Sequence, residues 1–224
     1  MTANPVAWRI LQIADSAFPT GGFAHSSGLE AAMHLGEAAT PERLDAYLQN
    51  LLWNAGNASM PYVAAAYDRP SDVWTLDARI DAFLTSHVAN RASRTQGRSF
   101  VATCARVFDE PELGLLGAQS RAREVKVHFA PVLGAATAAL ALGRRDALAL
   151  YLFLTLRGAA SAAVRLGIVG TYEAQRVQQR HGSTMDTVLE RCASLRPEQA
   201  ATTAPLPDLF GATHDRLYAR LFQS

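Results

Sequence analysis

Lysine is the residue that this sequence most clearly lacks, because Lys126 is the only one among its 224 residues. A P-loop needs a lysine followed by serine or threonine, whereas Lys126 lies between two valines. The sequence therefore excludes that nucleotide-binding motif, and arginine carries nearly all of the positive charge.

Cysteine is almost absent as well. Cys104 and Cys192 are far apart, and they form neither a CxxC unit nor a disulfide framework. Two free thiols are typical of a cytosolic protein, so we expect a cytoplasmic location. No basic region leads into a long apolar run near Met1, so we expect no signal peptide.

Charge is scarce too: charged residues make up 18% of the chain, and the net charge is +1. This balance gives no electrostatic footprint for nucleic acid or for an anionic membrane, so we expect neither as a partner. The longest apolar run, residues 147–156, is about half as long as a membrane span and ends at Arg157. It predicts a buried helix.

Strand signals are also missing, since no stretch alternates convincingly at period two. Apolar residues instead repeat at helical spacing, as in Leu44, Leu48 and Leu51 after the start signal at Thr40. We predict an all-α, single-domain helical bundle over residues 1–195. A linker rich in Pro, Thr and Ala would follow over residues 196–207, and a C-terminal docking segment over residues 208–224.

The chain's most unusual stretch is a turn within residues 11–32. Pro19 fixes φ, and the adjacent Gly21 and Gly22 can adopt positive φ. Ser27 and Glu30 are three residues apart, which predicts a capping box at the start of the next helix. Such a turn can present peptide groups to a partner, or it can simply reverse the chain direction; its local features fit both functions.

Residues that could support metal or nucleophilic chemistry are scattered. The six histidines are His25, His34, His87, His128, His181 and His214. None lies at metal-ligand spacing from another His or Cys, so we expect no metal site and no cofactor. Residues 24–28 loosely match a nucleophile elbow around Ser26, but that elbow requires a preceding strand. We expect Ser26 to act in capping, and the protein not to be an enzyme.

Three arginines share one face of a predicted helix, since Arg91, Arg94 and Arg98 are three and four residues apart. They could bind carboxylates or phosphates of a partner, or form a solvated face. Arg157 and Arg165 interrupt very apolar surroundings. Each therefore needs an internal ion pair or a partner contact.

The last segment is amphipathic. Leu217, Leu221 and Phe222 form an apolar stripe after the predicted linker. The stripe can dock on a partner as a helix in a groove, or pack back on its own domain.

Residues 19–30, Pro-Thr-Gly-Gly-Phe-Ala-His-Ser-Ser-Gly-Leu-Glu, strongly resemble the signature of the UreF family of urease accessory proteins. Three weaker matches follow in the family's order, at residues 91–98, 128–134 and 214–224. The chain departs from many family members at His25, where they have Tyr. Together these stretches span most of the chain.

The resemblance implies a function in the assembly of urease's nickel centre. A UreF-type protein works as a dimer with a UreD-type (also called UreH-type) accessory protein. Together they bring the nickel-carrying GTPase UreG to apo-urease. By this analogy the chain is a scaffold and regulator that neither hydrolyses GTP nor holds the catalytic nickel.

Three alternatives to this function remain: a nickel-binding metallochaperone using histidines such as His25 and His128, a small hydrolase using Ser26, and an all-α interaction module unrelated to urease. From the resembling motifs and the amphipathic tail, we predict partner-binding residues and no catalytic or metal-binding ones. These residues are Pro19, Gly21, Gly22, Phe23, His25, Ser26, Glu30, Arg94, Arg98, His128, His214, Tyr218, Leu221 and Phe222.

Overall fold

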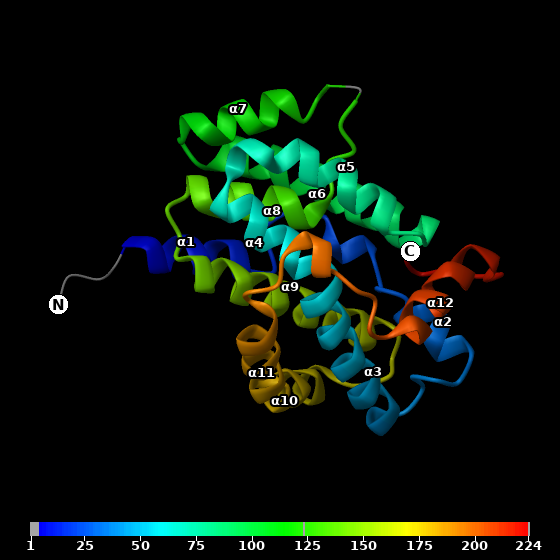
Figure 1. Ribbon diagram of the computed structural model, residues 1–224. Helices are drawn as coiled ribbons and strands as arrows, with labels where there is room; N and C mark the ends of the chain where they lie inside the picture. Colours follow the sequence, from blue (N-terminus) through cyan, green and yellow to red (C-terminus); the bar gives the residue numbers. More distant parts are fainter. Residues whose placement is uncertain (1–4, 123, 224) are drawn as a thin grey trace.

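The computed structural model describes residues 5–122 and 124–223, which form an all-α fold with no strand in this part of the chain (Figure 1). This confirms the predicted fold class. The helices are α1 (Pro5–Ala14), α2 (Leu29–His34), α3 (Pro41–Asn54), α4 (Met60–Asp68), α5 (Val73–Phe83), α6 (His87–Val107), α7 (Pro111–Gln119), α8 (Phe129–Ala139), α9 (Arg144–Arg165), α10 (Thr171–Arg180), α11 (Gly182–Cys192) and α12 (Pro205–Thr213).

Helix α9 lies at the centre of the fold and packs against helices on several sides, among them α1, α3, α4, α8 and α10 (Figure 1). Among the described residues it is the one helix long and apolar enough to cross a membrane by length and composition alone. However, 61% of its most apolar stretch is buried inside the protein. This burial matches the core helix predicted around residues 147–156, because a helix that is apolar on most sides is covered by other helices.

Close helix packing depends on small residues. At Gly134 of α8, a Cβ atom would overlap the backbone carbonyl of Val63 in α4. At Gly97 of α6, a Cβ atom would overlap the carbonyl of Val127, in the loop before α8. Both positions admit only glycine without moving the backbone, so α8 is held tightly between α4 and α6.

The helix starts follow the sequence in part. Thr40 caps α3 as predicted, its Oγ1 accepting the backbone N–H of Arg43 at 3.4 Å. The capping box predicted at Ser27 and Glu30 is wrong. Helix α2 begins one residue later, after Gly28 at φ +83°, and the Glu30 side chain turns away to bind another segment. The Glu30 carboxylate binds backbone N–H groups of the C-terminal segment, so it is not available to cap α2.

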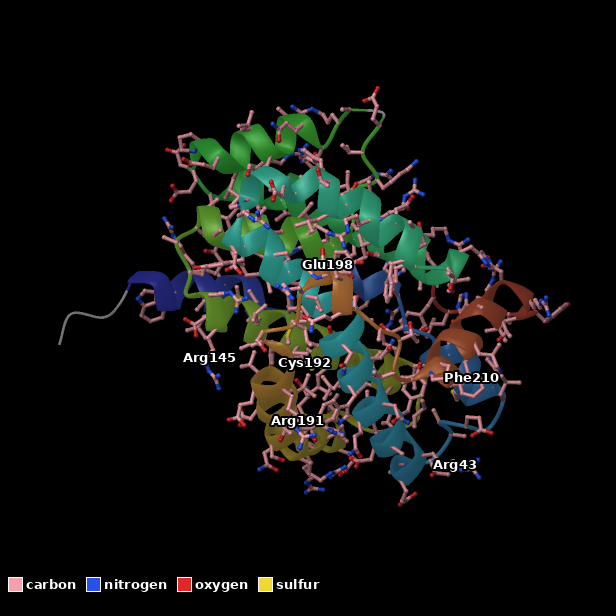
Figure 2. All side chains as sticks on the ribbon, viewed as in Figure 1. Arg43, Arg145, Arg191, Cys192, Glu198 and Phe210 are labelled. Carbon is pink, nitrogen blue, oxygen red and sulfur yellow. The ribbon has the colours of Figure 1, made fainter. Side chains whose placement is uncertain are left out.

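The segment between α11 and α12, where we predicted a linker, lies against the body. A π-helical turn, Ala55–Ser59, joins α3 to α4, and the carbonyl of Asn57 accepts the N–H of Ala201 at 3.2 Å. Glu198 binds Arg79 of α5 at 2.8 Å. Figure 2 shows Glu198 near the middle of the molecule and Phe210, which belongs to α12, toward the right of the view. The body therefore holds the chain in place up to the start of α12.

Candidate partner-binding site

The turn at residues 19–28 is fixed against α6. Gly21 has φ +77°, and a Cβ atom there would lie 2.8 Å from the Cβ of Ser99. Thr103 of α6 donates its hydroxyl to the carbonyl of Pro19 at 3.0 Å. The positive φ predicted for the glycine pair is found at Gly21, while Gly22 begins a short 3₁₀ turn. Pro19, Phe23 and Ser27 are exposed in this turn, and Phe23, at 71% exposure, is its large apolar side chain.

Glu30 binds the C-terminal segment. Its buried carboxylate accepts the backbone N–H groups of Leu221 and Phe222 at 2.6 and 3.2 Å. Nε2 of the buried His214 lies 2.9 Å from Glu30 Oε2. A single carboxylate thus satisfies three groups on a segment more than 180 residues away in sequence. The C-terminal part lies beside α2 in Figure 1.

Arg165 of α9 completes the junction between turn and tail. Its guanidinium lies 3.9 Å from the ring centre of Phe23 and 4.2 Å from that of the buried Phe222. It also donates to the carbonyl of Phe23, and Gln223 N–H donates to the carbonyl of Ala24 at 2.9 Å. Two aromatic faces and a carbonyl therefore stabilise this cation in place of a carboxylate.

Asp215 fixes the tail to the start of α6. Its carboxylate binds Arg91 at 2.8 Å, His87 at 3.0 Å and Arg220 at 3.1 Å. The hydrogen bond from Arg91 is the largest influence, and it lowers the pKa of Asp215 to about 2. Arg91 is thus neutralised inside the chain and is not free for a partner.

The other two arginines of the predicted stripe behave differently. Arg98 is exposed on α6, whereas Arg94 is half-buried, and its Nε has no hydrogen-bond partner among the described residues. All three arginines lie on α6 at the predicted helical spacing, but their environments differ: Arg91 is paired, Arg94 is half-buried and Arg98 is exposed.

His25, the position at which the chain departs from many family members, is buried under the turn. Burial lowers its pKa, and the positive charge of Arg91 acts in the same direction. The neighbouring Ser26 is fully buried, and its Oγ accepts the N–H of Glu30 at 3.4 Å. Ser26 thus binds one N–H of the first turn of α2, although the N-cap position itself is Gly28, which has no side-chain cap.

A second buried polar group joins α5 to the loop before α8. The carboxylate of Asp77 accepts the backbone N–H groups of Lys126, Val127 and His128 at 2.7, 3.0 and 2.6 Å. Val127 has φ +67°, an unfavourable conformation for a β-branched residue. These three hydrogen bonds stabilise the strained loop.

The ring of His128 continues this network inward. Burial lowers its pKa, so the ring is neutral, with Nε2–H donating to Asp81 at 3.0 Å. Its Nδ1 then accepts the hydroxyl of Ser93 in α6, also at 3.0 Å. Burial raises the pKa of Asp81, but hydrogen bonds from Asn90 and His128 outweigh it, and the net shift is downward. His128 therefore connects two of the family-like stretches, residues 128–134 and residues 91–98, inside the core.

The predicted partner-binding residues thus separate into two groups. The turn and the tail come together around Glu30 and expose Phe23, Tyr218 and Leu221. His128 is fully buried among internal hydrogen bonds, and Arg94 and Arg98 belong to α6. No group of three His, Cys, Asp or Glu residues among the described ones is arranged to hold a metal ion.

Sequence reasoning missed Asp215 altogether, and it singled out Arg165 without placing it in this site. Asp215 had no local signal, because its partners Arg91 and His87 are more than 120 residues away. Arg165 had a signal, a cation in apolar surroundings, and its partners proved to be two aromatic rings.

Comparison with known proteins gives a consistent result. The UreF family model matches residues 38–181. Urease accessory protein F of Arabidopsis thaliana is 37% identical, over 97% of this chain and 92% of its own length. Urease accessory protein F of Oryza sativa subsp. indica is 32% identical, over 96% of this chain and 84% of its own. Urease accessory protein UreF of Cupriavidus taiwanensis is 32% identical, over 96% of each.

Proposed function

This chain belongs to the UreF family of urease accessory proteins, and on that premise we propose that it is a scaffold and regulator in the nickel-dependent maturation of urease. In this proposal it binds a UreD-type partner and a UreG-type GTPase and brings them to apo-urease. We propose that it works in the cytoplasm, as a dimer within that complex.

The observation that carries the proposal is the union of turn and tail at Glu30. The family-like stretch and the C-terminal segment are far apart in sequence, yet the buried carboxylate of Glu30, the last residue of that stretch, binds three groups of the tail. Their exposed apolar side chains, Phe23, Tyr218 and Leu221, are then held on a fixed base. Aromatic and apolar anchors on an ordered backbone give strong protein contacts, because little conformational entropy is lost on binding.

The relatives are named as accessory proteins, and Ser26 gives no support to a hydrolase. Its side chain is fully buried, and no strand precedes it in the part of the chain that the structure describes. A nucleophile elbow presents its serine at the end of a strand, where substrate can reach it. We therefore propose a binding function rather than a catalytic one.

The test is a co-expression experiment with urease, a UreD-type protein and a UreG-type GTPase. The double variant Tyr218→Ala, Leu221→Ala removes exposed apolar contacts while retaining the backbone bond of residue 221 to Glu30. We expect at least a tenfold loss of co-purified UreD-type protein, since hot-spot side chains each contribute about 2 kcal/mol or more.

A matched control is Leu115→Ala on α7, because Leu115 is 59% exposed and Leu221 52%. It should leave both co-purification and urease activation unchanged. Full binding and activation by the double variant would refute this surface. Unchanged urease activation without the chain altogether would refute the function.

A further inference from the structure

A cleft of about 390 Å³ opens beside the turn, between the turn, the start of α6, α9 and the π-helical turn at Ala55–Ser59. Its walls include aromatic and aliphatic side chains such as Phe83, Leu84, Phe129 and Leu154. The volume is within the range that receives one or two side chains or a small ligand.

The charged side chains that line this cleft are all positive among the described residues. Among the described residues that line it, Arg157 and Arg165 are charged, and none is Asp, Glu or Lys. Arg157 is half-buried and donates to the carbonyl of Ala14, without a carboxylate in hydrogen-bond contact among the described residues. Burial lowers its pKa, and the charge of the exposed Asp15 opposes that effect only in part. Asp15 is not part of the cleft wall.

Arg165 likewise has no carboxylate partner among the described residues. Two guanidinium groups beside apolar walls therefore keep part of their donor capacity unused. Arg157 is partly buried without a counter-ion, which is costly, and an added carboxylate would offset that cost. Arg165 is already stabilised by two aromatic faces and a carbonyl, but a guanidinium has five N–H donors, so it can also donate to the same carboxylate.

Helix α9 leaves room between these two arginines. Gly158 lines the cleft, and a Cβ atom there would meet no other atom within 4 Å. Ser161 also lines the cleft and is exposed, four residues from both Arg157 and Arg165. Arg157, Ser161 and Arg165 share one helix face, so an occupant can lie along that face and reach both cations.

We infer that this cleft receives a peptide segment of a partner protein that inserts an apolar side chain and sets an adjacent carboxylate against Arg157 and Arg165. The inference rests on the proposed function, because it names the chemistry of a segment that the scaffold would bind. The apolar walls of the cleft favour the peptide's apolar side chain. Arg157 and Arg165, which have no carboxylate partner among the described residues, favour its carboxylate.

The probe is a fluorescein-labelled peptide, Gly-Leu-Asp-Phe-Glu-Leu-Gly, blocked at its C-terminus as an amide. One matched peptide carries Asn and Gln in place of the acids, and another carries Ala in place of Leu and Phe. Fluorescence anisotropy with the purified full chain measures binding. We expect the acidic apolar peptide to bind about 10- to 100-fold more tightly than its amide counterpart, the range for hydrogen bonds to charged groups.

Ser161→Glu supplies an internal carboxylate at helical spacing from both arginines, so it should lower peptide affinity at least tenfold. Ser161→Gln has nearly the same size without the charge, and it should bind as the unaltered chain does. Because Ser161 is exposed, neither change disturbs the core, and circular dichroism checks this. Gly158→Phe should block all three peptides by filling the cleft.

Equal affinity for the acidic and amide peptides would refute the inference, as would unchanged binding by Ser161→Glu. If benzoate competes fully with the peptide at equal concentration, the site is one for small carboxylates and the inference is wrong. If Ser161→Glu instead turns a dimer into a monomer, the cleft is an interface between two copies and the inference is also wrong.

Urease activation separates this inference from the proposed function. Loss of peptide binding with normal activation in Ser161→Glu refutes the role of the cleft and leaves the scaffold function standing. Selective peptide binding by a chain that never activates urease refutes the scaffold function and retains the cleft as a peptide site.

Discussion

Replacing Glu30 by glutamine should release the C-terminal segment without unfolding the helical core. The carboxylate accepts three hydrogen bonds, from Leu221 N–H, Phe222 N–H and His214 Nε2. Glutamine has nearly the same shape, but its NH₂ group places a donor against groups that are themselves donors.

The magnitude follows from those contacts. Hydrogen bonds to a charged group contribute roughly 1.5–3 kcal/mol each, so losing the equivalent of one or two costs about 3 kcal/mol. Burying a side chain such as Phe222 contributes a similar amount, about 1.5–3 kcal/mol. The loss is thus comparable to what holds the tail down, and the tail should open locally about 100-fold more often.

Hydrogen exchange read by NMR gives the measurement. The amides of Leu221 and Phe222 should exchange about 100-fold faster in Glu30→Gln, while core amides of α9, such as that of Leu152, keep their protection. Glu37→Gln is the matched control, because Glu37 is exposed and makes no described side-chain bond. Unchanged exchange of the Leu221 and Phe222 amides would refute the idea that Glu30 holds the tail in place. An equal loss of exchange protection in α9 would show that the tail and the core open together.

Four further predictions follow from the same contacts. Removing residues 214–224 should abolish binding to a UreD-type partner while the helical circular dichroism spectrum persists; retained pull-down with a large fall in melting temperature would make the tail a core element. Calorimetry should detect no submicromolar nickel site, since His128 uses both ring nitrogens internally; a stoichiometric site lost in His25→Ala or His128→Ala would overturn this. Sedimentation at tens of micromolar should show self-association, because large apolar faces carry few charges; a monomer even with the UreD-type partner would count against it. Burial raises the pKa of Cys104 to about 12, so neither Cys104 nor the buried Cys192 should react with a disulfide reagent at pH 8 before unfolding; rapid native reaction would contradict their burial.

How far sequence reasoning reached is clearest at individual residues. Thr40 caps its helix as predicted, because a cap needs only groups three residues apart. The same rule failed at Ser27 and Glu30, since the Glu30 carboxylate found stronger partners in the tail. Local rules hold where no distant segment competes for the same atoms.

The position of the tail shows the same limit. The apolar stripe of Leu217, Leu221 and Phe222 could be read from the sequence, but not its docking surface. Phe222 is buried beside Arg165, while Leu221 stays exposed. The tail therefore packs on its own domain through Phe222, while Leu221 remains exposed.

The sequence by itself determined the helical fold, the buried central helix and the family, because helical periodicity and a long unusual motif are local properties of the chain. Only the tertiary structure decided which distant groups share a site. A charged side chain such as Glu30, Asp215 or Arg165 bonds to whatever folding brings within about 3 Å. Hydrogen-bond and ion-pair energies fall steeply with distance, and distance in space does not follow distance in sequence.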